Sequence, residues 1–197
     1  MFANRYTALI DACSLADALR RDLLLSLAEA EFFRVRWSDE ILEETSRAIC
    51  GILCKRGLGG SAALKAERAL CRMRQAFPEA DVGEHIQHLP NGLVLPDDGD
   101  LHVVSAALKA QAQTIVTENL ADFPNGVLHS LGLEARSSDD FIADTIALDE
   151  GRAVKAVAKM RARLHRPELT PEKLLQNCEG RGLLATAAQL YPFVHLI

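Results

Sequence analysis

The sequence predicts an α/β fold with a mainly parallel five-stranded sheet and a helical C-terminal extension. Short segments of strand character alternate with longer helical segments up to about residue 140, which is the pattern of βα units. Beyond that point the pattern is helical throughout. We therefore predict an α/β domain over residues 1–140 and a helical extension packed on it over residues 141–197.

Five segments have strand character. The first is short and apolar, and the second alternates large apolar residues with arginines, as a strand with one solvated face does. The third is the weakest of the five. In chain order the predicted strands are 7–10, 32–37, 92–95, 114–117 and 133–136.

Helical segments separate these strands. In the segment 40–55, apolar residues recur close to every 3.6 positions, which indicates an amphipathic helix. The glycine-rich turn 57–61 lacks the spacing of a nucleotide-binding loop, and Ser61 is predicted to cap the helix that follows. The predicted helices of the first domain are 15–30, 40–55, 62–77 and 101–112.

Further helices are predicted after the last strand. One begins near Ser138, and another is predicted over 153–164. Pro171 is suited to the first position of a third helix, and a final one is predicted from Gly182 to just before Pro192.

Composition limits the classes of function. The chain has 197 residues and a formal net charge of −5, which argues against a general nucleic-acid coat, because such proteins bind through many lysines and arginines. It does not exclude a nuclease with an acidic site. The five cysteines form no CxxC pair and are predicted to be reduced thiols. We find no secretory signal and no apolar run of the roughly 20 residues that span a bilayer, so we predict a cytoplasmic protein without membrane contact.

Acidic residues occupy positions where strands end or helices begin. Asp11 follows the first apolar strand, Asp97 and Asp100 flank a turn before a helix, and Asp122 follows the fourth strand. Glu44 lies on the helix 40–55. Ligands of open α/β sheets bind at the carboxyl ends of strands, and carboxylates gathered there repel one another unless a divalent cation neutralises them. The pattern indicates a metal-dependent phosphodiester hydrolase.

Four motifs resemble those of the PIN-domain ribonucleases. They are Leu9-Ile10-Asp11-Ala12-Cys13, Ile41-Leu42-Glu43-Glu44, the run from Leu95 to Ala107 that contains Asp97-Asp98-Gly99-Asp100, and Ile115-Val116-Thr117-Glu118-Asn119-Leu120-Ala121-Asp122-Phe123-Pro124. The last two are the specific ones. Their order and spacing match over roughly residues 7–140, and the tail resembles the helical extension of a VapC-like toxin subgroup.

The resemblance implies a three-layer α/β/α sandwich, dependence on Mg²⁺ or Mn²⁺, RNA hydrolysis and an antitoxin protein as partner. Asp11, Glu44, Asp100 and Asp122 would form the catalytic acidic quartet. The metal would be held by Asp11, Asp100 and Asp122 with Asp97, supported by Asn119 and the hydroxyl of Thr117. Within this set, Glu44 would orient or deprotonate the attacking water.

Two positions depart from the family pattern. Cys13 stands where the motif usually has Asn, and Asn119 stands where many PIN domains carry an acid. The first departure keeps open an alternative, a catalytically weak or inactive PIN-like module that binds RNA or a protein. A phosphatase of the haloacid dehalogenase type is disfavoured, because its second acid would fall at Cys13.

Each acid also has a structural alternative. Asp11 and Asp122 are suited to turns, Asp100 to capping the helix from Leu101, and Glu44 to a solvated helix face. A metal site at His85 and His88 lacks a third ligand nearby.

Cations for an RNA substrate would come first from the basic tail, whose members are Arg152, Lys155, Lys159, Arg161, Arg163 and Arg166. Apolar helices near the start of the chain are compatible with a homodimer.

Overall fold

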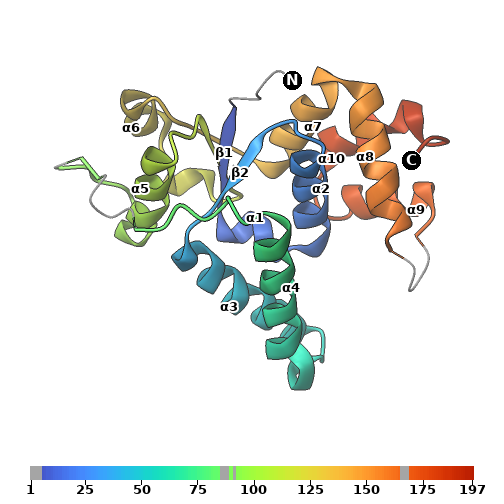
Figure 1. The fold of residues 1–197 in the computed structure, drawn as a ribbon, viewed down its shortest axis with the longest axis horizontal. Helices are drawn as coiled ribbons and strands as arrows, with labels where there is room; N and C mark the ends of the chain where they lie inside the picture. The colour runs from blue at the N-terminus through green and yellow to red at the C-terminus, as the bar shows by residue number, and fades with distance from the viewer. Residues whose placement is uncertain (1–5, 85–88, 91, 165–168) are drawn as a thin grey trace.

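Four short parallel strands form the sheet at the centre of the molecule, in the order β2-β1-β3-β4 (Figure 1). The computed structural model describes residues 6–84, 89–90, 92–164 and 169–197. The strands are β1 (Thr7–Ile10), β2 (Arg34–Arg36), β3 (Thr114–Val116) and β4 (Glu134–Arg136). Apolar β1 and β3 residues are buried, as expected for central strands covered on both faces.

The strand order places a topological switch between β1 and β3. From β1 the chain continues to β2 on one side, and it later returns to β3 on the other side of β1. The crevice at the carboxyl ends of two such strands is the usual ligand site of an open α/β sheet. Asp11 follows β1 directly and Thr117 follows β3 directly, so both lie at this crevice.

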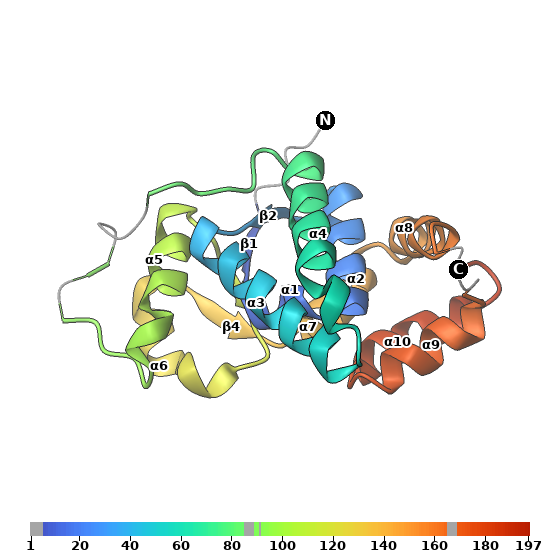
Figure 2. The ribbon, with the colours of Figure 1, turned by 90° about the horizontal axis from the view of Figure 1, so that it is seen from below.

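Helices cover both faces of the sheet, which confirms the three-layer α/β/α architecture. The two views agree that α5 (Leu101–Lys109) and α6 (Asn125–Leu128) lie on one side of the strands (Figures 1 and 2). On the other side lie α2 (Ala18–Glu29) and α7 (Ser138–Leu148). Below the sheet in Figure 1, α3 (Asp39–Lys55) packs against α4 (Ala62–Ala76) and against the short helix α1 (Ala12–Ala16).

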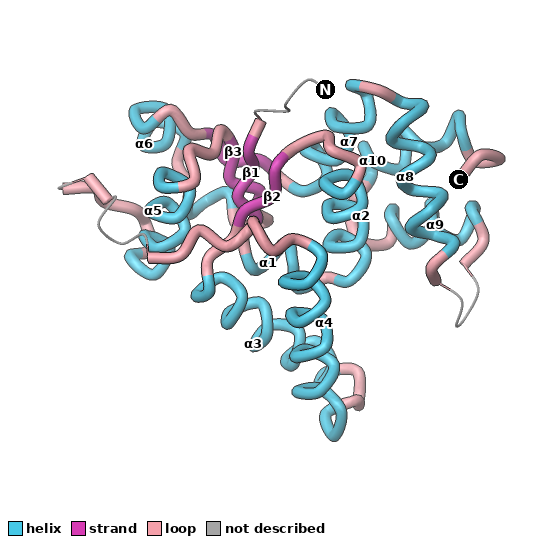
Figure 3. Tube along the Cα trace, viewed as in Figure 1, coloured by secondary structure: helices cyan, strands magenta, loops and turns pink. Residues whose placement is uncertain are grey.

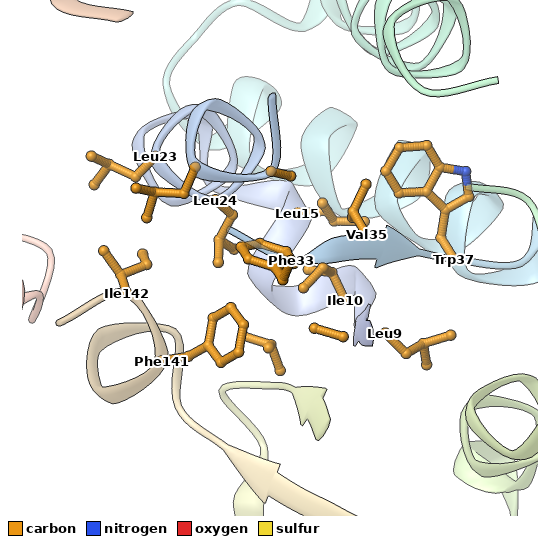
Figure 4. Packing of buried hydrophobic residues seen from close by; sticks show 14 of the residues in the cluster. Leu9, Ile10, Leu15, Leu23, Leu24, Phe33, Val35, Trp37, Phe141 and Ile142 are labelled. Atoms are coloured by element: carbon orange, nitrogen blue, oxygen red, sulfur yellow. The ribbon is translucent and has the colours of Figure 1, made fainter. Parts of the chain in front are cut away.

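The core joins the sheet to the helices on the α2 side. Figure 4 shows Phe33 and Phe141 facing one another beside Ile10, and their ring centroids are 4.9 Å apart in an edge-on arrangement. Phe141 belongs to α7, so this contact joins α7 to the core on the α2 side of the sheet. Edge-on aromatic pairs add about 0.5–1.5 kcal/mol beyond the area they bury.

In the described C-terminal residues, helices follow one another with loops between them and no strand is present (Figure 3). After α7 come α8 (Glu150–Ala162), α9 (Pro171–Glu179) and α10 (Leu184–Leu190). Helix α8 packs against α2, and α10 packs against α7. The carboxylate of Asp139 in α7 accepts hydrogen bonds from the backbone N–H groups of Ala185 and Thr186, each at 2.8 Å, and thereby caps α10 from a distance. Pro171 occupies the first turn of α9, as predicted.

The predicted strand 92–95 was wrong. Gly92 has a positive φ of 81°, and Leu93 N–H donates within a turn to the carbonyl of Pro90 at 3.3 Å. Leu95 is buried while Val94 is 71% exposed, so the segment is anchored by one side chain and pairs with no strand in the described structure. The edge of the sheet is instead extended by a parallel bridge between Trp37 and Asp81.

The single helix predicted over 15–30 was also wrong, because the chain bends at Asp17. Asp17 is extended, with φ −74° and ψ 125°, and separates α1 from α2. Its carboxylate accepts the N–H groups of Leu19 at 3.0 Å and Arg20 at 3.1 Å. The composition of good helix formers hid this cap, since an Asp inside such a run can equally be solvated.

Ser61 does not cap α4 as predicted. It lies at the N-cap position, but its hydroxyl donates to the carbonyl of Leu58 at 3.3 Å instead of accepting from the helix. The remaining short elements are 3₁₀ turns: η1 (Gly59–Ser61), η3 (Asp98–Asp100), η4 (Leu120–Asp122), η5 (His129–Leu131) and η6 (Tyr191–Phe193). In the part of the chain described, no helix has the length and apolarity needed to cross a membrane.

Candidate active site

Asp11 is held at the carboxyl end of β1 by three hydrogen bonds. Only 7% of the residue is exposed. Its Oδ1 accepts the N–H of Ala12 at 2.6 Å, and its Oδ2 accepts the hydroxyl of Thr117 at 2.7 Å and the thiol of Cys13 at 3.0 Å. A buried carboxylate needs such donors, and here they also fix its direction. Asp11 therefore has its structural role in a turn, through the N–H of Ala12, and also contacts Thr117 at the end of β3.

Cys13 supplies a donor beside Asp11, at the position where the family motif usually has Asn. Its sulfur also accepts the N–H of Glu118 at 3.2 Å and lies 3.3 Å from the hydroxyl of Thr117. Burial, followed by the negative charge of Asp11, raises the pKa of the thiol to about 11. Cys13 therefore keeps its proton at neutral pH and bridges the ends of β1 and β3.

Asp100 has a carboxylate oxygen without a donor. It precedes α5 but makes no side-chain capping hydrogen bond. The alternative that its carboxylate serves only to cap this helix is therefore wrong. Its Oδ2 is buried and has no hydrogen-bond partner among the described residues. Burial, followed by the negative charges of Asp11, Asp122, Asp97 and Glu44, raises its pKa from 3.8 to about 6.

After burial, which is the largest cause, the charges of the other predicted acids contribute to the raised pKa of Asp100, so these acids lie near enough to repel it. Within the described residues, however, no three acidic, histidine or cysteine side chains are already gathered closely enough to hold a metal ion. The two findings agree in physical terms, because charges repel over several ångströms whereas ligation of Mg²⁺ requires oxygens at about 2.0–2.1 Å.

The donor set fits Mg²⁺ or Mn²⁺. Both ions prefer oxygen ligands, and the groups around Asp100 are carboxylates. The unpartnered Oδ2 of Asp100 is a buried acceptor that a cation would satisfy.

Glu44 faces the same region from α3. Its Oε1 lies 3.4 Å from Nε2 of His102 in α5 and 3.7 Å from a guanidinium nitrogen of Arg47. Glu43, beside it in sequence, is exposed. The helix phase therefore directs Glu44, and not Glu43, toward α5.

The loop after β3 brings Thr117, Asn119 and Asp122 together, and Asp97 lies in the turn before Asp100. The amide of Asn119 donates to the carboxylate of Asp122, and the backbone N–H of Asn119 donates to the hydroxyl of Thr117 at 3.1 Å. Asp97 accepts the N–H of Gly99 at 2.8 Å and so shapes the turn before Asp100. These three side chains are positioned by local contacts, and their part in metal binding stays a prediction.

Several cations of the basic tail are occupied by contacts within the protein. Lys159 and Arg163 both pair with Glu29 of α2, at 2.9 and 3.0 Å. The guanidinium of Arg152 lies 4.1 Å above the ring of Phe32. These contacts fasten α8 to the sheet domain and weaken the argument that the same side chains serve RNA. Arg166, His85 and His88 lie outside the described residues.

One contact of the site was missed by sequence reasoning. Glu118, in the loop after β3, pairs with Arg20 of α2 at 3.1 Å and accepts the N–H of Ser138 at 3.1 Å. Arg20 in turn donates to the carbonyl of Arg181 at 2.7 Å. The loop that carries Thr117, Asn119 and Asp122 is therefore tied to the C-terminal helices. No sequence signal joins these residues, and Arg20 lies 161 positions from Arg181 in the chain.

Comparison with known families decides between the alternatives for the fold. The PIN domain family matches residues 7–121, which is more than half of the chain. The chain is a member of the PIN domain family. The helical part from residue 138 to residue 192 matches a second family, described as the VapC50 C-terminal domain. Membership of the PIN family removes the haloacid dehalogenase alternative.

A curated relative carries the same family name. The protein named "Putative ribonuclease VapC50" from Mycobacterium tuberculosis (strain ATCC 25618 / H37Rv) is 36% identical over 95 residues. The match covers 47% of this PIN-domain chain and 56% of the relative, so it spans little more than half of that protein. No solved structure matches the chain.

Proposed function

We propose that this PIN domain is an endoribonuclease that requires Mg²⁺ or Mn²⁺. The observation that supports the proposal most directly is Asp100. Its buried carboxylate oxygen has no hydrogen-bond partner among the residues that the structure describes, and burial together with four other acids raises its pKa. Such a cluster is costly without a cation, and perturbed carboxylates gather at functional sites. The name of the relative from Mycobacterium tuberculosis supports RNA as the substrate.

In the proposed reaction, each acidic residue would have a separate role. A bound divalent ion would supply a nucleophilic water at neutral pH and offset charge on the scissile phosphate. Asp11 and Asp100 would hold it, while Thr117 and Cys13 fix the direction of Asp11. Glu44 would orient the water or accept its proton. Asp122 would complete the site, with Asp97 and Asn119 as supporting groups.

We further propose that the protein acts as the toxin of a toxin–antitoxin pair in the cytoplasm. The support is the match of its C-terminal helices to the VapC50 C-terminal domain. The alternative of an inactive binding module depended on Cys13, but Cys13 supplies a hydrogen bond to Asp11 and so preserves its orientation. A homodimer stays a prediction, and the buried leucines of α2 give it no support.

The direct test is cleavage of RNA by the purified protein with Mg²⁺, with Mn²⁺ and with EDTA. We expect cleavage only with metal. Asp11→Asn and Asp100→Asn should each lower it by more than about 100-fold, the upper end of the loss seen when even an outer-shell partner of a metal is removed.

Glu43→Gln is the matched control, since Glu43 is an exposed neighbour of Glu44. It should cleave like the wild type. Cleavage that persists in EDTA and survives both Asp→Asn changes would contradict the proposal. Tight RNA binding without cleavage would select the inactive-module alternative instead.

A further inference from the structure

His102 occupies an unusual position beside the acidic cluster. Its side chain is only 14% exposed, and it lies on α5 two residues after Asp100. Both ring nitrogens are buried, and neither makes a hydrogen bond within the described part of the protein. Buried polar atoms in folded proteins nearly always have a hydrogen-bond partner. The ring of His102 is therefore expected to form a hydrogen bond that is not formed in this conformation.

The carboxylate of Glu44 lies beside the ring of His102. Nε2 of His102 lies 3.4 Å from Oε1 of Glu44, close enough for a charge contact although not aligned as a hydrogen bond. The other neighbour of Oε1, Arg47, is 3.7 Å away with a side chain that is 68% exposed. An exposed arginine is mobile and screened by water, so it cannot hold Glu44 in one direction.

His102 can hold Glu44 because it is itself fixed. It is carried by α5, the helix that follows Asp100, whereas Glu44 is carried by α3. A hydrogen bond from Nε2–H of His102 to Oε1 of Glu44 would therefore join α3, which carries Glu44, to α5, which follows Asp100. The bond requires no change in the charge of the ring, since the neutral Nε2 tautomer and the imidazolium both carry this proton.

We infer that His102 is a positioning residue that orients Glu44 toward the water attacking the phosphate. The inference rests on the proposed function, which gives Glu44 its part in the reaction. His102 acts through Glu44 and contacts no substrate in this account. It belongs with the outer-shell groups that orient metal-site carboxylates.

The contact itself is tested without any activity measurement. In metal-free protein with ¹⁵N-labelled histidine, the His102 ring resonances are identified by their loss in His102→Gln. Glu44→Gln should shift these resonances, and Glu43→Gln, one position away and exposed, should leave them in place. Resonances that do not respond to Glu44→Gln overturn the inference.

The role in the reaction is tested by kinetics on RNA. His102→Leu should lower kcat by about 10- to 100-fold with little change in KM, as expected for an outer-shell partner. His102→Gln should recover most of this loss, because its amide places a donor near the position of Nε2. His102→Leu should cost nothing further in a Glu44→Gln background, since residues that act as one unit are not additive.

The outcomes separate the inference from the proposed function. Metal-dependent cleavage that is lost in Asp100→Asn but unchanged in His102→Leu overturns the inference alone. Full additivity of His102→Leu and Glu44→Gln also overturns it. Absence of metal-dependent cleavage in the wild type overturns the proposed function and the inference with it. If His102→Leu does not fold, the comparison of wild type with His102→Gln and the nitrogen resonances still decide.

Discussion

At the scale of single residues, Asp100 contributes an unfavourable charge to the metal-free fold. Its pKa rises from 3.8 to about 6 through burial and through the negative charges of neighbouring acids. The folded protein therefore binds a proton more tightly than the unfolded chain does. The contribution of Asp100 to the stability then falls as pH rises between these two values and is lowest above about 6. The ionised carboxylate of Asp100 therefore lowers the stability of the metal-free protein, as groups at functional sites often do.

This cost predicts that Asp100→Asn stabilises the protein when no metal is present. Asn has no charge, so the repulsion from the surrounding carboxylates disappears. In EDTA near pH 7, Asp100→Asn should melt at a higher temperature than the wild type. The difference should shrink as the pH falls toward about 3, below both the folded and the unfolded pKa, where Asp100 is protonated in both states. Thermal melts at the two pH values provide the measurement. An equal or lower melting temperature for the variant near pH 7 would count against the acidic cluster.

The sequence could place the acids but not their partners. Asp11 follows a strand, Asp100 precedes a helix and Asp122 lies in the loop after β3, and that local pattern was the basis for predicting a common site. The donors of Asp11 could not be predicted, because Thr117 is 106 residues away in the chain. The approach of His102 to Glu44 likewise depends on how α3 and α5 pack.

At the scale of elements, Asp17 shows how one residue divides a helical run into α1 and α2. It accepts two backbone N–H groups of α2 and also pairs with Arg181 at 3.1 Å. The bend directs α1 toward α3 and α2 toward α8. Propensity favoured one continuous helix, but local hydrogen bonding by the Asp carboxylate prevailed.

Asp17→Ala should therefore destabilise the fold by about 0.5–2 kcal/mol, the usual cost of losing an N-cap. Ser61→Ala is the matched control, because Ser61 sits at a helix start without capping it, and its effect should stay within about 0.5 kcal/mol. Urea unfolding of both variants gives the comparison. Equal effects of the two changes would show that the Asp17 hydrogen bonds do not stabilise α2.

The strand predicted over 92–95 illustrates the limit of pattern reading for short elements. A run of apolar residues around a glycine suits a strand or a turn equally well. The structure selects the turn, because Gly92 takes a positive φ and Val94 points to solvent.

At the scale of the whole molecule, the C-terminal helices are fastened to the loop that carries the site. Glu118 of that loop contacts Arg20 and Ser138, and Arg20 reaches the carbonyl of Arg181. The helical character of the C-terminal part was predictable from its periodicity. This network was not, because it joins segments that are distant in sequence.

Arg20→Ala should cost about 1.5–3 kcal/mol of stability, since it removes hydrogen bonds that involve a charged group and leaves the carboxylate of Glu118 without its cation. Arg74→Ala removes a comparable but exposed pair with Asp39 and should cost about 0–1 kcal/mol. Chemical denaturation of both variants measures the difference. Similar losses in the two would mean that the Arg20 network does not join the helical part to the site loop.

The central claim is that the acids around Asp100 form one binding site for a divalent ion. Binding of Mn²⁺ to the purified protein, followed by electron paramagnetic resonance at neutral pH, tests it most directly. We predict that the wild type and Glu43→Gln bind Mn²⁺ with the same affinity and that Asp100→Asn binds it much more weakly. Equal binding by all three proteins, or no binding by the wild type, would contradict the account.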